Sequence, residues 1–491
     1  MKLNTTILLL ASSLLFGSCT DELLNTIPPS SLTDINYYND ANDMEKAVLG
    51  IYAKMQSRKP NDYQLLELSS DNLYGSTNTG FAGIPEIDAL AISPTNPILT
   101  AFWQESYAGI FRANAVISNI DKPKDYTESK KNQHLGEAKF MRALFYFDLA
   151  RTFGAVPKVL TALSIDEARQ YKRSATEAIY DQIIQDLNDA IEKLPLKSAL
   201  SRNRASKEAA LALLGKVYVA KKDWTNAETV LRQFFTSYGD NYMLVADYNQ
   251  LWSLENENNS EVLFSIGYTD GTNGQDLSTA FVPNGGIYNL VSRGSEVALP
   301  SWSLHKKIQA DDTRLRKTVE SNYFSAVSGG QNAIYFPYAS KFIVKHTALA
   351  AGLDLPVLRL ADVILLYAEA LNENGKLGDA ITQLNKIRQR AFGSQNHNYS
   401  IDQLTQKDQF VTALLDERQI ELAFECERWY DLVRQGKMTA VMKVEERNYN
   451  PSSQIAQKVT LSPKDYMHLF PIPQTEIDLV GKTILEQNPG Y

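Results

Sequence analysis

Apolar side chains recur every three or four positions along most of this chain, a spacing that predicts a mostly α-helical protein. The clearest example covers 174–194, where one helical face is apolar and Pro195 ends the helix. Ser174 and Glu177 have the spacing of a capping box at the start of this helix. The apolar face consists of Tyr180, Ile183, Ile184, Leu187, Ile191 and Leu194.

The predicted helices come in pairs with a shared internal spacing. The segments 212–235 and 364–387 each contain two small residues twelve positions apart, with a polar turn between them. Small residues there let two helices approach closely, as in tetratricopeptide hairpins of about 34 residues. The small residues are Gly215 with Ala227, and Ala368 with Ala380. Pairs are predicted at about 43–119, 137–194, 206–237 and 358–391, the first two with long insertions between their helices.

Two stretches depart from the helical pattern. The region 240–357 is rich in glycine and proline, and its segment 261–268 alternates apolar and other residues as a short strand does. A second irregular stretch covers 69–100. Loops held on a rigid helical frame are where binding residues tend to lie. We therefore expect these two insertions to carry the functional side chains.

The amino end has the features of an export signal. Met1–Ser18 combines an early lysine, an apolar run and small residues before Cys19. The run is shorter than the about 20 apolar residues that a transmembrane helix needs. The segment "FGSC" (16–19) resembles a bacterial lipobox, which predicts that Cys19 is lipidated and that 19–40 is a solvated tether. The alternative is an ordinary secretory signal with an incidental cysteine.

Composition narrows the possible functions. The 491 residues are 44% hydrophobic and 22% charged, as in folded globular proteins. The net charge of -8 argues against a nucleic-acid partner, because phosphate binding needs clustered Lys and Arg. Cys19 and Cys426 are the only cysteines, which excludes a disulfide scaffold. The five histidines show no metal-ligand spacing, so neither a metal nor a cofactor is predicted.

One stretch, "DERQIELAFECERWYDLVRQGK" (416–437), has charged residues every three or four positions. This spacing predicts a structural charge network on one helix face, with Cys426 as a buried thiol in that helix. Two carboxylates so placed can also ligate a metal or act as an acid/base pair, but no histidine accompanies them. The charged residues are Glu417, Glu421, Glu425, Arg428 and Asp431. No catalytic residue is predicted.

Four stretches together resemble one protein family. They are "GEAKFMRALFYFDLARTFGAVP" (136–157), "VLRLADVILLYAEALNENG" (357–375), the charged stretch 416–437, and "LFPIPQTEIDL" (469–479) with the closing "QNPGY" (487–491). In this order they are similar to the SusD/RagB family of outer-membrane lipoproteins, named after component D of a starch-utilisation system. Cys426 departs from the small residue that is common at this position in the family.

The resemblance implies a fold, a location and a function. It implies a mostly α structure of tetratricopeptide-like hairpins with a loop-rich insertion carrying short strands, forming a single domain over 41–491. It further implies a non-catalytic lipoprotein at the cell surface that captures an oligosaccharide and passes it to a SusC-like TonB-dependent transporter. The alternatives are a peptide-binding receptor of the same family and a tetratricopeptide-type protein-interaction scaffold.

Under this resemblance, the stretches that correspond to the family's binding loops are 69–100 and 267–302, and the candidate binding residues come from them. Flat aromatic rings can contact the apolar faces of sugars, while carboxylates and amides can bind the hydroxyl groups. The aromatic candidates are Tyr74, Phe81, Tyr268, Phe281, Tyr288 and Trp302. The polar candidates are Asp71, Asn78, Asp270 and Asn284. The remaining tryptophans, Trp103, Trp224, Trp252 and Trp429, lie in helical or family-core stretches and are predicted to be structural.

Overall fold

The computed structural model describes residues 37–77, 80–346 and 350–491. The predicted signal peptide, Cys19, most of the tether and Asn78 lie outside the described residues. The first described helix, α3 (Ala41–Arg58), begins after Asp40, whose side chain accepts a hydrogen bond from the Asp43 N–H.

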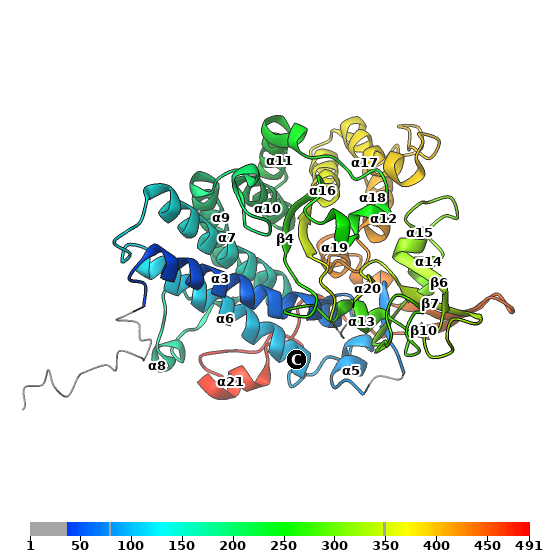
Figure 1. The fold of residues 1–491 in the computed structure, drawn as a ribbon, viewed down its shortest axis with the longest axis horizontal. Coiled ribbons are helices and arrows are strands. Elements are labelled where there is room, and N and C mark those ends of the chain that lie inside the picture. Colours follow the sequence, from blue (N-terminus) through cyan, green and yellow to red (C-terminus); the bar gives the residue numbers. More distant parts are fainter. Residues whose placement is uncertain (1–36, 78–79, 347–349) are drawn as a thin grey trace, which may run out of the picture.

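Eight helices form the frame, and they pair as the apolar periodicity predicts (Figure 1). Within each pair the helices contact each other, and α7, α10 and α16 each contact a helix of the preceding pair, so the frame is one continuous array. The mostly α fold class with paired helices is therefore confirmed. The pairs are α3 with α6 (Pro97–Asn119), α7 (Glu128–Phe153) with α9 (Thr176–Lys193), α10 (Lys207–Ala220) with α11 (Trp224–Tyr238), and α16 (Leu360–Glu373) with α17 (Leu377–Phe392).

The capping box predicted at the start of α9 is not present. Ala175 occupies the cap position and makes no side-chain cap hydrogen bond. Ser174 instead lies in β3 (Arg173–Ser174), which pairs antiparallel with β2 (Val156–Pro157). The short sheet holds the chain extended up to the residue before the cap, so the helix starts one residue later than the pattern suggests.

Glycine allows close helix packing in the third pair. A Cβ placed on Gly215 in α10 would lie 2.4 Å from Cδ2 of Leu231 in α11. The small residue Ala227 in α11 is also fully buried. The hairpin therefore needs a residue without a side chain at position 215.

We expect Gly215→Ala to lower the free energy of unfolding by about 1–3 kcal/mol, because overpacking outweighs the better helix propensity of alanine. The matched control is Gly378→Ala in α17, where an added Cβ meets no atom within 4 Å. This control should leave stability unchanged or raise it. Urea denaturation measures both; a G215A protein as stable as G378A would contradict the close-packing account.

The region 240–357 contains short strands and loops, as predicted. β4 (Val262–Ile266) pairs antiparallel with β8 (Leu355–Arg359), and all five β4 residues are buried. The alternation of apolar and other residues in this strand therefore does not mark one exposed and one buried face. Both faces are buried, because the strand contacts α3 and α10. The remaining two-stranded sheets are β1 (Leu73–Gly75) with β5 (Ala298–Pro300), β6 (Val319–Phe324) with β7 (Ala333–Ala339), and β9 (Val444–Asn450) with β10 (Ile455–Thr460).

The charged stretch 416–437 forms two helices rather than one. α18 (Lys407–Glu421) ends before a turn in which Phe424 and Cys426 have φ of 68° and 71°. That left-handed backbone cannot continue a right-handed helix, and α19 (Arg428–Arg434) starts afresh. Cys426 is buried as predicted, but in the turn, where its N–H donates to Glu67 Oε1 at 2.6 Å.

The charge network is confirmed, and it lies inside the protein. Glu421 is fully buried and accepts from three guanidinium groups, those of Arg314, Arg359 and Arg390, at 2.9, 2.6 and 2.5 Å. The other pairs are Glu417 with Arg314 and Arg388, Glu425 with Arg359 and Lys341, Asp431 with Arg418 and Arg434, and Arg428 with Asp71. Arg418 and Arg434 also pair with Asp362 and Glu369 of α16, so the stretch joins α16, α17, β8 and the 311–318 segment.

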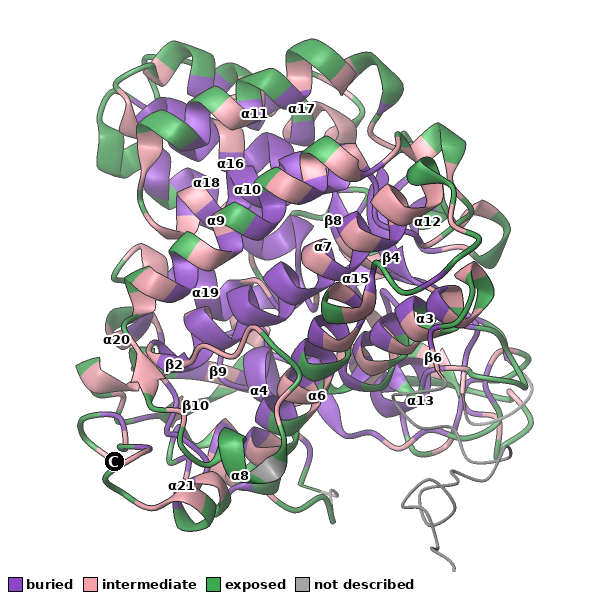
Figure 2. Cartoon of the chain, turned by 90° about the vertical axis from the view of Figure 1, so that its left-hand side faces the viewer, coloured by how far each residue is buried: buried purple, intermediate pink, exposed green. Residues whose placement is uncertain are grey.

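The core runs along the inner faces of the helical array (Figure 2). Trp252 and Trp429 are among its largest fully buried side chains, Trp103 is 3% exposed, and Trp224 is half-buried against the core. Their predicted structural role is consistent with these positions. The remaining described α-helices are α4 (Asp62–Leu66), α5 (Ile84–Asp88), α8 (Ile165–Ala168), α12 (Tyr248–Leu251), α13 (Leu277–Phe281), α14 (Trp302–His305), α15 (Leu315–Thr318), α20 (Met438–Val441) and α21 (Gln474–Val480).

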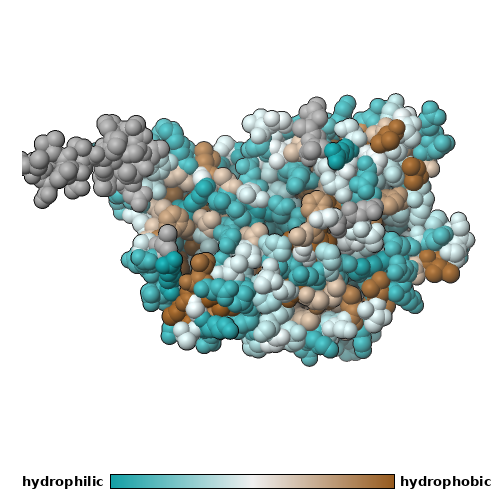
Figure 3. Space-filling view, turned by 90° about the horizontal axis from the view of Figure 1, so that it is seen from below, coloured by the Kyte–Doolittle hydropathy of each residue, from teal (hydrophilic) through white to brown (hydrophobic). Residues whose placement is uncertain are grey.

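Among the described helices, none is long and apolar enough to cross a membrane. The face seen in Figure 3 carries apolar patches that hydrophilic side chains separate from one another.

Candidate functional site

An open cleft of about 440 Å³ lies among the β-strands and the α14 segment. The β6–β7 and β9–β10 hairpins lie at one end of the molecule (Figure 1). Four segments distant in sequence form the cleft: β1, the segment from β5 into α14, β7, and the β9–β10 hairpin. β1 pairs with β5, and β5 contacts β7, so these walls are held together by backbone structure. The cleft is lined by Tyr74, Leu299, Pro300, Trp302, His305, Tyr335, Phe336, Pro337, Asn448, Tyr449, Asn450, Pro451 and Ser452.

Two aromatic rings form a flat apolar slab in this cleft. Trp302 and Tyr449 are stacked with ring centroids 3.7 Å apart and planes 4° apart. His305 meets Trp302 edge-on, with centroids 4.9 Å apart. Because each stacked ring covers one face of the other, a ligand contacts the remaining faces and edges. A slab of this kind suits a flat, partly apolar ligand such as a sugar ring.

Polar groups border the slab. The Tyr74 hydroxyl donates to Asn448 Oδ1 at 2.7 Å, and Asn448 Nδ2 donates to Gln457 Oε1 at 3.0 Å. Nδ1 of His305 is buried and has no hydrogen-bond partner among the described residues. Burial lowers the pKa of His305, so its ring is neutral at neutral pH and offers one donor and one acceptor. These amide, hydroxyl and imidazole groups can bind hydroxyl groups of a ligand.

The β9–β10 hairpin is anchored at its base. Arg447 donates to both carboxylate oxygens of Asp88, at 2.8 and 2.9 Å, and to Glu445 at 2.7 Å. The Arg447 guanidinium also lies 5.0 Å from the centre of the Tyr74 ring. This arrangement fixes the strand that leads to Asn448 and Tyr449 against the 69–100 insertion.

The base of the hairpin also contains a buried carboxyl group, that of Glu445, whose charged form is disfavoured by burial. Glu445 is 1% exposed, and its Oε1 has no hydrogen-bond partner among the described residues. Burial raises the pKa of Glu445 to about 8, although Arg447 opposes the rise. The folded protein therefore holds a proton that the unfolded chain releases near pH 4–5, and stability falls as pH rises from about 5 to about 8.

We expect Glu445→Gln to flatten this pH dependence. The amide keeps an acceptor for Arg447 and cannot ionise, so the variant should exceed the wild type in stability at pH 8 by roughly 1–3 kcal/mol. At pH 5 the two proteins should be similar. Urea denaturation at pH 5, 6.5 and 8 measures the difference, and a constant offset between the two proteins would show that Glu445 does not titrate in this window.

The structure brings together two of the six aromatic residues predicted from the sequence. Trp302 and Tyr74 both line the cleft. Phe81 and Tyr288 are 48% and 47% exposed but lie outside its lining. The other two are corrected to core residues: Tyr268 is 4% exposed and donates to the Gln56 carbonyl, and Phe281 is fully buried against Tyr63 and Phe424.

None of the three described polar candidates lines the cleft. Asp71 is 5% exposed and forms a bidentate pair with Arg428 at 2.7 and 3.0 Å, which corrects the expectation that it faces a ligand. Asp270 and Asn284 are exposed but do not line the cleft.

Sequence reasoning missed the residues from β7 and from the β9–β10 hairpin. Tyr335 lies within the loop-rich region but beyond 267–302, and Tyr449 lies well outside both insertions. A local signal exists for the turn of this hairpin, because the segment "NYNPSSQ" (448–454) is rich in the turn-forming residues Asn, Pro and Ser.

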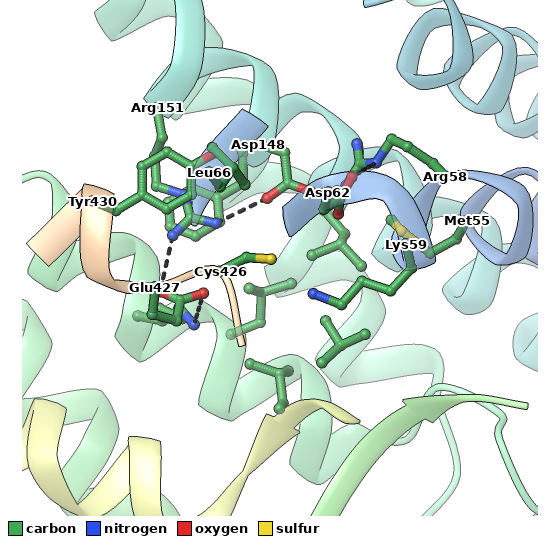
Figure 4. A pocket seen from close by; sticks show the side chains of 16 residues that line it. Met55, Arg58, Lys59, Asp62, Leu66, Asp148, Arg151, Cys426, Glu427 and Tyr430 are labelled. Atoms are coloured by element: carbon green, nitrogen blue, oxygen red, sulfur yellow. Dashed lines mark hydrogen bonds and ion pairs between the residues drawn. The ribbon is translucent and has the colours of Figure 1, made fainter. Parts of the chain in front are cut away.

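A smaller cavity of about 30 Å³ lies among buried charged side chains (Figure 4). Arg151 donates to Asp148 at 2.8 Å and to Glu427 at 3.2 Å, and Cys426 and Lys59 point into the same space. Burial raises the pKa of the Cys426 thiol well above its usual value, which makes this sulfur a poor nucleophile. The volume suits one or two water molecules and is too small for an oligosaccharide.

Another open cleft of about 430 Å³ lies between α6, α8 and α21. Trp103, Tyr107 and Leu479 contribute to a mainly apolar lining, and Gln104 donates across it to Glu476 at 2.8 Å. It offers fewer polar groups around an open aromatic face than the cleft of Trp302 does.

Two family profiles match the chain. The SusD family profile matches residues 263–491, and a profile described as "Starch-binding associating with outer membrane" matches residues 33–219. The chain is 27% identical over 509 residues to the SusD-like protein P2 of Formosa agariphila, covering 96% of this chain and 97% of that protein. It is 23% identical to the starch-binding protein SusD of Bacteroides thetaiotaomicron, covering 76% and 75% of the two chains.

Solved structures share the fold. A SusD-like protein from Bacteroides fragilis superposes with a TM-score of 0.81 at 21% identity, covering 95% of this chain and all of that one. A laminarin-binding SusD-like protein superposes with a TM-score of 0.77 at 26% identity, covering 92% of this chain and all of that one.

Proposed function

Because this chain belongs to the SusD family, we propose that it is a cell-surface lipoprotein that captures an oligosaccharide and passes it to a SusC-like TonB-dependent transporter in the outer membrane. The sugar binds in the cleft of Trp302 and Tyr449. The protein itself acts as a binding protein and carries out no reaction.

The aromatic slab is the observation that carries this proposal. Trp302 and Tyr449 present a flat apolar surface, and amide, hydroxyl and imidazole groups surround it. Sugar rings need this combination, since their C–H faces are apolar and their rims are polar. Two relatives described as laminarin-binding and starch-binding support a carbohydrate ligand.

Affinity electrophoresis through gels containing single polysaccharides tests the binding function. A retarded band, followed by calorimetry with the matching oligosaccharide and no new reducing ends, is the expected result. New reducing ends would indicate an enzyme. Binding to peptides alone, with no glycan retarding the protein, would favour the peptide-receptor alternative.

The lipid anchor is a separate part of the proposal, because Cys19 lies outside the described residues. We expect Cys19→Ala to move the protein from the membrane fraction to the soluble fraction, since several acyl chains at that cysteine would supply stable anchoring. The matched control is Cys426→Ala, which removes the buried thiol and should leave the protein with membranes. Membrane retention of C19A would place the anchor elsewhere.

The transporter partner rests on the family resemblance. Purification of the tagged protein in mild detergent from its native host should recover a TonB-dependent outer-membrane protein. Recovery of unrelated soluble proteins instead would favour the scaffold alternative, in which the paired helices dock protein segments.

A further inference from the structure

The described residues that line the cleft carry no full charge. None of them is Asp, Glu, Lys or Arg, and the polar atoms come from Asn448, Asn450, Ser452, His305 and tyrosine hydroxyls. The other two cavities described above both include charged lining residues. The absence of charged groups restricts what the cleft can bind.

The cations next in sequence to lining residues are already paired with carboxylates. Arg447 lies against the Tyr74 ring and is held by Asp88 and Glu445. Lys306, next to His305, forms an ion pair with Glu446 at 2.6 Å. The Glu446 N–H in turn donates to Ser303 Oγ at 3.0 Å. Neither cation is available for an acidic ligand without breaking an existing pair.

An anionic sugar would lose water in this cleft without gaining a cationic partner. Burying a carboxylate or a sulfate is costly unless charged or multiple hydrogen-bond donors compensate, and arginine or lysine normally provides them. The net charge of -8 on the whole chain adds a long-range repulsion toward polyanions. Hydroxyl groups, by contrast, can exchange hydrogen bonds with amides and imidazole at little cost.

We propose that the cleft of Trp302 and Tyr449 accepts an uncharged oligosaccharide and rejects glycans that carry uronate or sulfate groups at the bound residues. The inference deepens the proposed function and rests on it. Selection against anions results from the uncharged lining and not from a steric block.

Matched ligands test the inference on the full chain. Laminarin, starch, xylan and mannan are each used in native, hydroxyethylated and carboxymethylated form, so that added bulk and added charge are separated. For the glycan that binds, the hydroxyethyl form should stay within about threefold of the native form, and the carboxymethyl form should bind at least about tenfold more weakly. Affinity for the native form should change little between 0.05 and 0.5 M NaCl.

A single substitution tests whether the uncharged lining causes the weak binding of carboxymethylated glycans. Ser452→Lys places one cation in the cleft and should recover at least threefold of the affinity for the carboxymethyl form at 0.05 M NaCl, with the gain lost at 0.5 M. Ser453→Lys, one residue further along and outside the lining, is the matched control and should recover none. An S452K protein that still rejects the charged form to the same degree overturns the inference.

The outcomes separate the two proposals. Tight, salt-sensitive binding of carboxymethylated or naturally uronate-bearing glycans, weakened by Trp302→Ala, keeps the proposed function and overturns the uncharged ligand. If no glycan of either class binds, the proposed function fails and the inference fails with it.

Discussion

Replacing Trp302 with alanine is expected to weaken glycan binding by about 2 kcal/mol, roughly 30-fold in Kd, while the protein stays folded. Trp302 is the largest ring in the cleft lining, and it stacks on Tyr449 at 3.7 Å and meets His305 edge-on. Its removal therefore takes away one of the two slab rings and leaves Tyr449 and His305 without their contact to it. Isothermal calorimetry with the glycan that the affinity gels identify measures the change.

Two further variants define what the loss means. Trp302→Phe keeps a flat ring and should lose less affinity than W302A. Tyr288 was also predicted from the sequence as a binding residue, and its side chain is 47% exposed, but it lies outside the cleft lining. The Tyr288→Ala protein should therefore bind the glycan as the wild type does. If Y288A is as impaired as W302A, the ligand extends over the outer surface of the insertion. Unchanged affinity in W302A would remove the slab from the mechanism.

The fold was largely predictable because helix pairing depends on local spacing. The apolar period of 3.6 residues and the small residues at positions such as Gly215 and Ala227 are readable within one hairpin. The structure accordingly has the four predicted pairs. The predicted capping box at Ser174 was wrong because Ser174 pairs in the sheet of β3 with β2 instead. That pairing joins segments too far apart in sequence to be recognised from the residues around Ser174.

The candidate site was predictable only in part, because it depends on whether each aromatic side chain faces the cleft or the core. Trp302 and Phe281 both occupy an irregular insertion, yet one lines the cleft and the other packs between Tyr63 and Phe424. Tyr449 completes the slab from a hairpin near the carboxyl end of the chain. No property of the sequence around Trp302 indicates that partner, since the contact arises from tertiary packing alone.

The charged stretch 416–437 shows the same limit from another direction. The spacing of its charged residues correctly predicted a charge network. The burial of that network could not be predicted, because the arginines that neutralise Glu421 lie elsewhere in the sequence. They are Arg314, Arg359 and Arg390. Glu421 is the centre of that network and is fully buried. Burial alone would raise the pKa of Glu421, but the three guanidinium groups hold it well below its usual range.

We therefore expect Glu421→Gln to lower the free energy of unfolding by about 3–5 kcal/mol, the largest stability effect predicted for this protein. A neutral amide cannot accept from three guanidinium groups, and its NH₂ group would face at least one of them donor to donor. The buried cations would then lack compensation, which costs more than the loss of a single hydrogen bond.

Urea denaturation at pH 7 measures the E421Q effect, with Glu177→Gln as the matched control. Glu177 pairs with Lys221 but its side chain is 78% exposed, so its loss should change stability by less than about 1 kcal/mol. If E421Q accumulates only as insoluble protein, Glu425→Gln at the edge of the same network provides a milder variant, because Glu425 contacts Arg359 and Lys341 and is 9% exposed. A decrease of about 1 kcal/mol or less in the free energy of unfolding of both network variants would contradict this account. It would mean that the three arginines are solvated or otherwise compensated, because an uncompensated buried guanidinium group destabilises a protein by more than that.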